Sequence, residues 1–105
     1  MAVVKKEDVK PPVLPKETVS VEGIGDVVVQ GLLLSDRLEI FGAGRSVKVS
    51  HLLEKSVIDA SGEPLWTAHE WEVFGAPKQG FIETMKLYKV ARRLSGLDSE
   101  VAEKN

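Results

Sequence analysis

Cysteine is absent from this chain of 105 residues, and so is any long hydrophobic run. Without cysteine there is no disulfide framework and no thiolate metal site, which suits a reducing cytosol. The longest apolar run, Val27 to Leu34, is interrupted by Gln30 and Gly31. A membrane-spanning helix needs about 20 apolar residues, so this run is far too short to cross a bilayer.

A strong charge of either sign is also lacking, since the net charge is −2 and the pI is near 5.7. This balance argues against the basic footprint of a protein that binds duplex nucleic acid. The first 16 residues contain lysines and prolines but no apolar core like that of a signal peptide. We expect residues 1–16 to form a flexible arm and residues 17–105 to form one domain.

The clearest local signals lie between Trp66 and Gly75. Thr67 and Glu70 have the spacing of a capping box, in which each side chain bonds the other residue's backbone N–H. Trp66 and Trp71 have the spacing of a hydrophobic staple across that cap. The spacing predicts a helix over 68–74, ended by Gly75 in a left-handed conformation.

A second helix is predicted over 77–95, with Pro77 in its first turn and a Schellman stop at Gly96 and Leu97. Asp98 or Ser99 can cap a last short turn toward Ala102. The apolar positions cover more than one narrow stripe, so this helix is expected to be central and contacted on two sides. They are Phe81, Ile82, Met85, Leu87, Tyr88, Val90, Ala91 and Leu94.

The first half of the chain begins with two valine-rich segments, 18–22 and 26–30, on either side of a Gly23-Ile24-Gly25 turn. This order predicts a β-hairpin. Ser35 or Asp36 is then placed to cap a short helix that ends at Phe41, with Leu34, Leu38 and Phe41 on one face.

A helical repeat of apolar residues follows over 46–59, although 56–59 suits an extended segment equally well, and a turn over 60–64 leads into Trp66. The expected fold is therefore α+β and mostly α-helical, with an N-terminal β-hairpin packed with four or five short-to-medium helices.

Residues that carry chemistry are few and poorly spaced for it. His69 has Glu70 beside it and Glu72 nearby, but neighbours on a helix point about 100° apart, so the ligand spacing of a metal site is missing. Ser50 cannot face His51 for the same reason. The glycines around 41–45 lack the pattern of a dinucleotide loop, and Arg92 and Arg93 are typical of a helix C-terminus. The tryptophans are explained by the staple without a ligand pocket. We expect no enzyme activity, no metal and no cofactor.

The order of these motifs resembles the tail assembly chaperones of long-tailed bacteriophages of the lambdoid type. The resemblance covers residues 17–105 and includes the chain ending Glu-Lys-Asn. The residues that carry it are Val57, Asp59, Gly62, Pro64, Leu65, Trp66, Trp71, Phe74, Gly75, Leu94, Gly96, Leu97, Glu103, Lys104 and Asn105.

The resemblance implies a protein of the host cytoplasm that is absent from the finished virion. It implies binding to the tape measure protein, whose hydrophobic helices stay soluble until the tail tube protein polymerises around them. A frameshifted, extended form would recruit the tail tube protein, and copies would associate with themselves, in some family members as a spiral. No nucleic acid and no membrane is expected as a partner.

We expect the arm and the hairpin to contact neighbouring copies, because the Val27–Leu34 segment is hard to cover in so short a chain. The residues from 97 to the end are expected to stay accessible for the extension. The residues predicted to form protein contacts are Val27, Val29, Leu32, Leu33, Leu97 and Val101. Two other readings are a generic adaptor or antitoxin-like regulator and, less favoured, a small nucleic-acid binder that uses Arg92 and Arg93.

Overall fold

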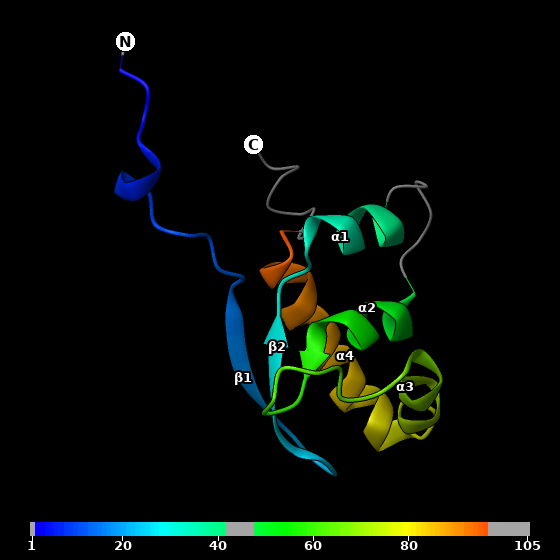
Figure 1. Cartoon of the computed structure of the whole chain (residues 1–105). Helices are drawn as coiled ribbons and strands as arrows, with labels where there is room; N and C mark the ends of the chain where they lie inside the picture. The colour runs from blue at the N-terminus through cyan, green and yellow to red at the C-terminus, as the bar shows by residue number, and fades with distance from the viewer. Residues whose placement is uncertain (1, 42–47, 97–105) are drawn as a thin grey trace, which may run out of the picture.

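The chain folds into an α+β arrangement in which four α-helices pack against a small antiparallel sheet (Figure 1). The computed structural model describes residues 2–41 and 48–96. In chain order the elements are the 3₁₀ turn η1 (Lys6–Asp8), β1 (Lys16–Val21), β2 (Gly25–Gln30), α1 (Leu34–Phe41), α2 (Val49–Ser56), β3 (Val57–Ile58), α3 (Ala68–Phe74) and α4 (Lys78–Leu94). The predicted fold class is confirmed, with a third strand added to the hairpin.

The sheet has the order β1-β2-β3, and both strand pairs are antiparallel. The hairpin closes where Val21 pairs with Gly25, and Gly23 and Gly25 have φ values of 94° and 117°, which favour glycine. The predicted hairpin is therefore confirmed. The helix expected over 46–59 ends at Ser56, and the extended alternative for its end is correct because Val57 and Ile58 pair with β2.

The turn after β3 is held by one carboxylate. Asp59 Oδ1 accepts hydrogen bonds from the Ser61 amide at 2.8 Å, the Ser61 hydroxyl at 2.7 Å and the Glu63 amide at 3.1 Å. These bonds, with that from the Ser61 hydroxyl the strongest, lower the pKa of Asp59. The turn returns the chain so that Leu65 N–H bonds Val57 O, which brings Trp66 toward α3.

One face of the sheet contributes to the core. Val27 and Val29 alternate along β2 and are 5% and 0% exposed, because residues two apart on a strand point to the same face. In Figure 1 the helices lie to one side of the sheet, with α2 in front of α4. The buried apolar core consists of Val21, Val27, Val29, Leu32, Leu52, Leu53, Val57, Trp71, Leu87 and Ala91.

Helix α3 begins as its sequence predicts. Thr67 Oγ1 accepts from the Glu70 amide at 3.2 Å, and Glu70 Oε1 accepts from the Thr67 amide at 2.9 Å, which confirms the capping box. The Trp66 and Trp71 rings meet edge to face with centroids 4.7 Å apart, as a staple requires. The prediction for Gly75 is wrong, since its φ of −83° and ψ of −1° are right-handed.

Gly75 and Gly80 instead allow α3 and α4 to approach each other closely. A Cβ atom at Gly80 would lie 1.8 Å from Phe74 O, and one at Gly75 would lie 3.0 Å from Thr84 Oγ1. These two positions therefore need glycine for space and not for backbone conformation.

Helix α4 is central, as predicted, and contacts both the sheet and the helices α2 and α3. Pro77 occupies the N-cap position and not the first turn, because its ψ of 159° is extended. The left-handed Gly96 that ends the helix is confirmed by its φ of 70°, whereas Leu97 and the turn proposed after it lie outside the described residues.

The buried face of α4 differs from the prediction at its N-terminal end. Phe81 and Ile82 are 56% and 49% exposed, while Glu83 and Thr84 are buried. Leu87 and Ala91 are fully buried as expected. Glu83 is buried in place of Phe81 and Ile82 because its carboxylate has a hydrogen-bond partner on the hairpin.

Glu83 joins α4 to the tip of the hairpin. Its Oε1 atom accepts from the Glu22 amide at 2.9 Å and lies 2.9 Å from Lys86 Nζ, which also donates to Ser20 O at 2.8 Å. Lys86, followed by the Glu22 amide, lowers the pKa of Glu83 below its ordinary value of 4.5. A charged carboxylate thus holds β1 against α4.

The arm leads away from this body. Residues 2–13 are exposed, and η1 is the one helical turn among them (Figure 1). The radius of gyration of 15.8 Å exceeds the value of about 13 Å expected for a compact domain of this size, and the longest dimension is 58 Å. The arm joins the body at Pro15, whose carbonyl accepts from Gly31 N–H at 2.9 Å. Strand β1 begins at Lys16, one residue before the predicted domain boundary.

Candidate protein-interaction surfaces

Three of the six residues predicted to form protein contacts are buried inside the domain. Val27, Val29 and Leu32 are 5%, 0% and 9% exposed, so within one copy of the chain their side chains face the core and not the surface. The first part of the Val27–Leu34 segment is covered, because β2 turns alternate valines toward the helices and Leu32 follows them into the core, whereas Leu33 and Leu34 stay exposed. Leu97 and Val101 lie outside the described residues.

Leu33 is the predicted contact residue that the structure leaves open, and it belongs to a larger apolar surface. Leu33, Leu34 and Leu38 are 55%, 71% and 61% exposed. Leu34 and Leu38 stand one helical turn apart on α1, so their side chains share one face. We call these three leucines the α1 face. The sequence indicated that Leu34 and Leu38 share a face, but gave no sign that this face is uncovered.

Polar contacts attach α1 to the body. Arg37 Nη1 donates to Ser95 O at 2.7 Å, and the Ser95 hydroxyl accepts from the Leu32 amide at 3.3 Å. Lys55 Nζ lies 3.7 Å from Asp36 Oδ1 and 3.9 Å from a Glu39 carboxylate oxygen. These contacts fix the position of α1 while its leucines remain free to bind.

A second apolar surface lies where α3 meets α4. A cleft of about 160 Å³ opens there, and we call it the α3–α4 cleft. Its lining residues are Val49, Ser50, Trp71, Glu72, Gly75, Phe81, Thr84 and Met85. An engineered cavity of about 150 Å³ holds one benzene, so this cleft has room for one ring or branched side chain and not for a cofactor.

Two buried polar groups beside this cleft have no partner. Trp71 Nε1 and Thr84 Oγ1 belong to residues that are 1% and 6% exposed, and neither atom has a hydrogen bond within the described part of the chain. Leaving a buried polar group unpaired costs about 1–3 kcal/mol, so such groups are expected to gain from an incoming partner. The cleft therefore combines an apolar floor with unsatisfied polar atoms.

A second groove of about 530 Å³ runs beside Trp66, but its carboxylates already have structural tasks. Its lining includes Glu54 and Glu70. Glu54 Oε2 accepts from the Ala68 amide at 3.1 Å, and Glu70 accepts from the Thr67 amide. Both acids thus serve the N-terminus of α3, and this groove offers less to a partner than the cleft does.

The residues considered for chemistry are not brought together. Ser50 is buried while His51 is exposed, and His69 is exposed on α3. Within residues 2–41 and 48–96, no group of three or more histidine, aspartate or glutamate side chains is placed to hold a metal ion.

The two arginines considered for phosphate have partners inside the protein. Arg93 Nη2 lies 2.6 Å from Glu17 Oε1. Arg92 donates to the Tyr88 hydroxyl at 2.9 Å and lies over its ring.

No helix in the described ranges is long and apolar enough to cross a membrane. Neither the known protein families, nor the curated proteins, nor the solved structures contain a match to this chain.

Proposed function

We propose that this protein is a phage tail assembly chaperone that binds the tape measure protein and keeps its hydrophobic helices in solution during tail morphogenesis. In this proposal it acts in the host cytoplasm and is absent from the mature virion. A frameshifted, extended form brings in tail tube subunits. The motif order from the hairpin to the chain ending supports this assignment through its resemblance to that family.

The single structural observation behind the proposal is the exposed α1 face. Leu33, just before α1, and Leu34 and Leu38 on α1 are each more than half exposed, and α1 is fixed to the body by Arg37 and Lys55. Adjacent exposed leucines of this kind are typical of a surface that binds another protein. The spacing of Leu34 and Leu38 suits the apolar stripe of a client helix, which repeats at three and four residues.

An elongated client also explains why one small face suffices. A tape measure protein offers many apolar helical stretches in one chain, so several copies of the chaperone can bind along it. Copies that also contact one another gain avidity without high affinity at each site. Many weak sites of this kind release their client more readily than one tight site does.

The experiment is co-purification of a tagged tape measure protein with full-length chaperone. The double variant Leu34→Asp, Leu38→Asp is expected to lose the client, because two charges would enter the apolar contact. The matched control is Ile82→Asp, which alters an apolar residue of similar exposure on α4. Aspartate at Leu34 lies in the first turn of α1, where the helix dipole favours it, so the fold is retained.

The result also separates this function from that of a generic adaptor or regulator. Many copies of a chaperone bind one client, so the mass of the complex grows with the length of the client fragment. An adaptor binds one compact partner at a fixed ratio. Loss of binding in the Ile82→Asp control with retention in the α1 variant would contradict the assignment of the α1 face.

A further inference from the structure

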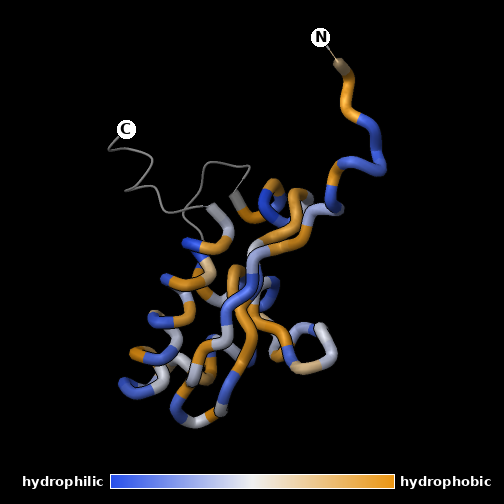
Figure 2. The backbone as a smooth tube through the Cα atoms, turned by 90° about the vertical axis from the view of Figure 1, so that its left-hand side faces the viewer, coloured by the Kyte–Doolittle hydropathy of each residue, from blue (hydrophilic) through white to orange (hydrophobic). Residues whose placement is uncertain are grey.

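Most of the proline-rich part of the arm, from Lys10 to Val13, is exposed. Lys10-Pro11-Pro12-Val13-Leu14-Pro15 holds three of the five prolines. Val13 is 87% exposed, and the whole arm carries further exposed valines at positions 3, 4 and 9. Figure 2 shows hydrophobic segments on the arm where it leaves the body. Apolar side chains held this far from any core are available to another molecule.

The sequence also fixes the shape of this segment. Proline holds φ near −65°, and a residue that precedes proline is driven to extended conformations. These limits favour a polyproline II helix, whose carbonyls have no internal hydrogen bonds. Because it is ordered before binding, such a segment loses little entropy when it docks on an aromatic surface.

We propose that the Lys10–Leu14 segment of one copy docks in the α3–α4 cleft of a second copy, so that copies join head to tail. The cleft has the features that such a segment needs. Phe81 supplies an exposed aromatic wall, the buried Trp71 also lines the cleft, and the volume of about 160 Å³ accepts a proline ring or a valine side chain.

Charge sets the direction of docking. Glu72 is exposed on α3 and lines the cleft, and Lys10 precedes the two prolines. A lysine beside the proline-rich segment can therefore pair with the carboxylate beside the aromatic cleft. A pair at the rim adds specificity and a faster association more than affinity.

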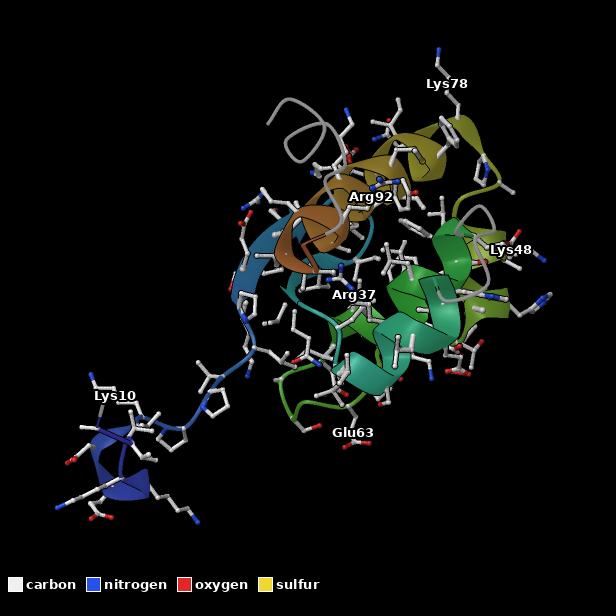
Figure 3. The ribbon with its side chains drawn as sticks, turned by 90° about the horizontal axis from the view of Figure 1, so that it is seen from above. Lys10, Arg37, Lys48, Glu63, Lys78 and Arg92 are labelled. Atoms are coloured by element: carbon white, nitrogen blue, oxygen red, sulfur yellow. The ribbon has the colours of Figure 1, made fainter. Side chains whose placement is uncertain are left out.

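The segment cannot reach the cleft of its own chain. Pro15 lies beside Leu94, since both would contact a Cβ atom placed at Gly31. The part of α4 from Phe81 to Leu94 spans about 20 Å at 1.5 Å per residue. Even fully extended, the chain from Pro15 back to Lys10 covers at most about 18 Å, and back to Pro12 about 11 Å. Figure 3 shows Lys10 on the opposite side of the molecule from Lys48 and Lys78, which stand at the starts of α2 and α4.

Joining the arm of one copy to the cleft of the next is a heterologous contact. Such contacts repeat into a ring if the rotation closes, or into an open helical array if it does not. This inference rests on the self-association in the proposed function and adds the segments that form it. It leaves the α1 face of every copy uncovered for the client.

The test mixes two full-length variants that lack complementary halves of the contact. Val13→Asp retains a cleft but has no docking segment, and Phe81→Asp retains the segment but has a blocked cleft. In sedimentation velocity the wild-type chain is expected to form a concentration-dependent series of oligomers, and each variant alone is expected to stay monomeric. An equimolar mixture is expected to stop at a heterodimer, because one arm and one cleft remain intact.

The matched controls make the same kind of substitution, an apolar residue to aspartate, at positions outside the proposed contact. Val4→Asp changes another exposed arm valine, and Ile82→Asp changes an exposed residue of α4 that does not line the cleft. Both are expected to assemble like the wild type. A wild-type chain that stays monomeric, a single variant that still assembles, or a mixture that gives no heterodimer would each overturn the proposal.

A charge exchange gives a second route if Phe81→Asp does not fold. Glu72→Lys is expected to weaken assembly about tenfold, because two lysines then meet at the rim. Adding Lys10→Glu to that variant is expected to restore assembly, and a failure to restore it would count against the pairing. The α1 double variant separates the two proposals, since it is expected to lose the client while its assembly is unchanged.

Discussion

The leucines of α1 are exposed, whereas those of α2 and α4 named below are buried. Leu52, Leu53 and Leu87 are fully buried, whereas Leu34 and Leu38 are more than 60% exposed. All five lie on helices whose apolar residues recur at helical spacing. Helical periodicity therefore shows which residues share a face, but it does not show whether the domain or a partner covers that face.

The difference follows from how each helix is attached. Helix α4 places Leu87 and Ala91 in the core shared with β2 and α2. Helix α1 is attached by Arg37, by the Lys55 ion pairs and by Ile40, which packs against the core, while Leu34 and Leu38 stay exposed. Exposed apolar residues that do not stabilise the fold are expected to serve binding.

The sharpest test of this difference is the pair Leu87→Ala and Leu38→Ala. The buried leucine leaves a cavity, so its replacement is expected to lower the free energy of unfolding by about 2–5 kcal/mol. The exposed leucine is expected to change it by at most about 0.5 kcal/mol. Urea unfolding followed by tryptophan fluorescence measures both. A large effect at Leu38 would mean that α1 is part of the cooperative core.

Gly80→Ala tests the contact between α3 and α4 and has the next largest effect. Alanine normally stabilises a helix by about 1 kcal/mol relative to glycine. Here the new Cβ atom would lie 1.8 Å from Phe74 O, so the two helices must separate. We expect a net loss of about 1–3 kcal/mol in the same urea experiment. A gain in stability would show that α3 and α4 can separate to accept the new Cβ atom without a net cost.

Thr67→Ala removes the cap of α3 and is expected to cost about 1 kcal/mol. The Glu70 amide loses its hydroxyl acceptor, while the Trp66–Trp71 contact remains. Thr67→Ser keeps the acceptor and serves as the control. Thermal unfolding followed by circular dichroism distinguishes them, and equal midpoints for the alanine and serine variants would show that the staple alone starts the helix.

Much of the fold followed from local patterns in the sequence. The capping box, the tryptophan staple, the hairpin glycines and the left-handed Gly96 each depend on residues within a few positions of one another. Such signals act through the backbone of one segment, so sequence spacing is enough to detect them.

Most of the incorrect predictions required knowledge of a distant residue. Phe81 is among the apolar positions expected to be contacted, yet it is exposed and Glu83 is buried, because the partner of Glu83 is the Glu22 amide on the hairpin. Gly75 was assigned a left-handed conformation, while its true role is to make room for Thr84. For the contact surfaces, the valine-rich segment predicts a strand but does not show that the helices bury Val27 and Val29. The α3–α4 cleft gave no local signal, since α2, α3 and α4 all contribute to it.

Acid unfolding tests whether the hairpin, like α1, is attached by a polar contact. Lys86 and the Glu22 amide lower the pKa of Glu83 in the folded state. A carboxyl whose folded pKa is lowered stabilises the protein above its unfolded pKa, and that stabilisation is lost as the pH falls through the folded value. We therefore expect thermal stability to decline as the pH drops below the ordinary value of 4.5, and Glu83→Gln to reduce that decline.

The matched control for the acid experiment is Glu7→Gln, which removes one exposed carboxylate from η1 and leaves the hairpin contact intact. The pH dependence of the thermal midpoint is measured for the wild type and both variants. If Glu83→Gln leaves the slope unchanged, the contact between β1 and α4 depends on the apolar core beneath it. Polar attachment would then matter at α1, the helix proposed to bind the client, and not at the hairpin.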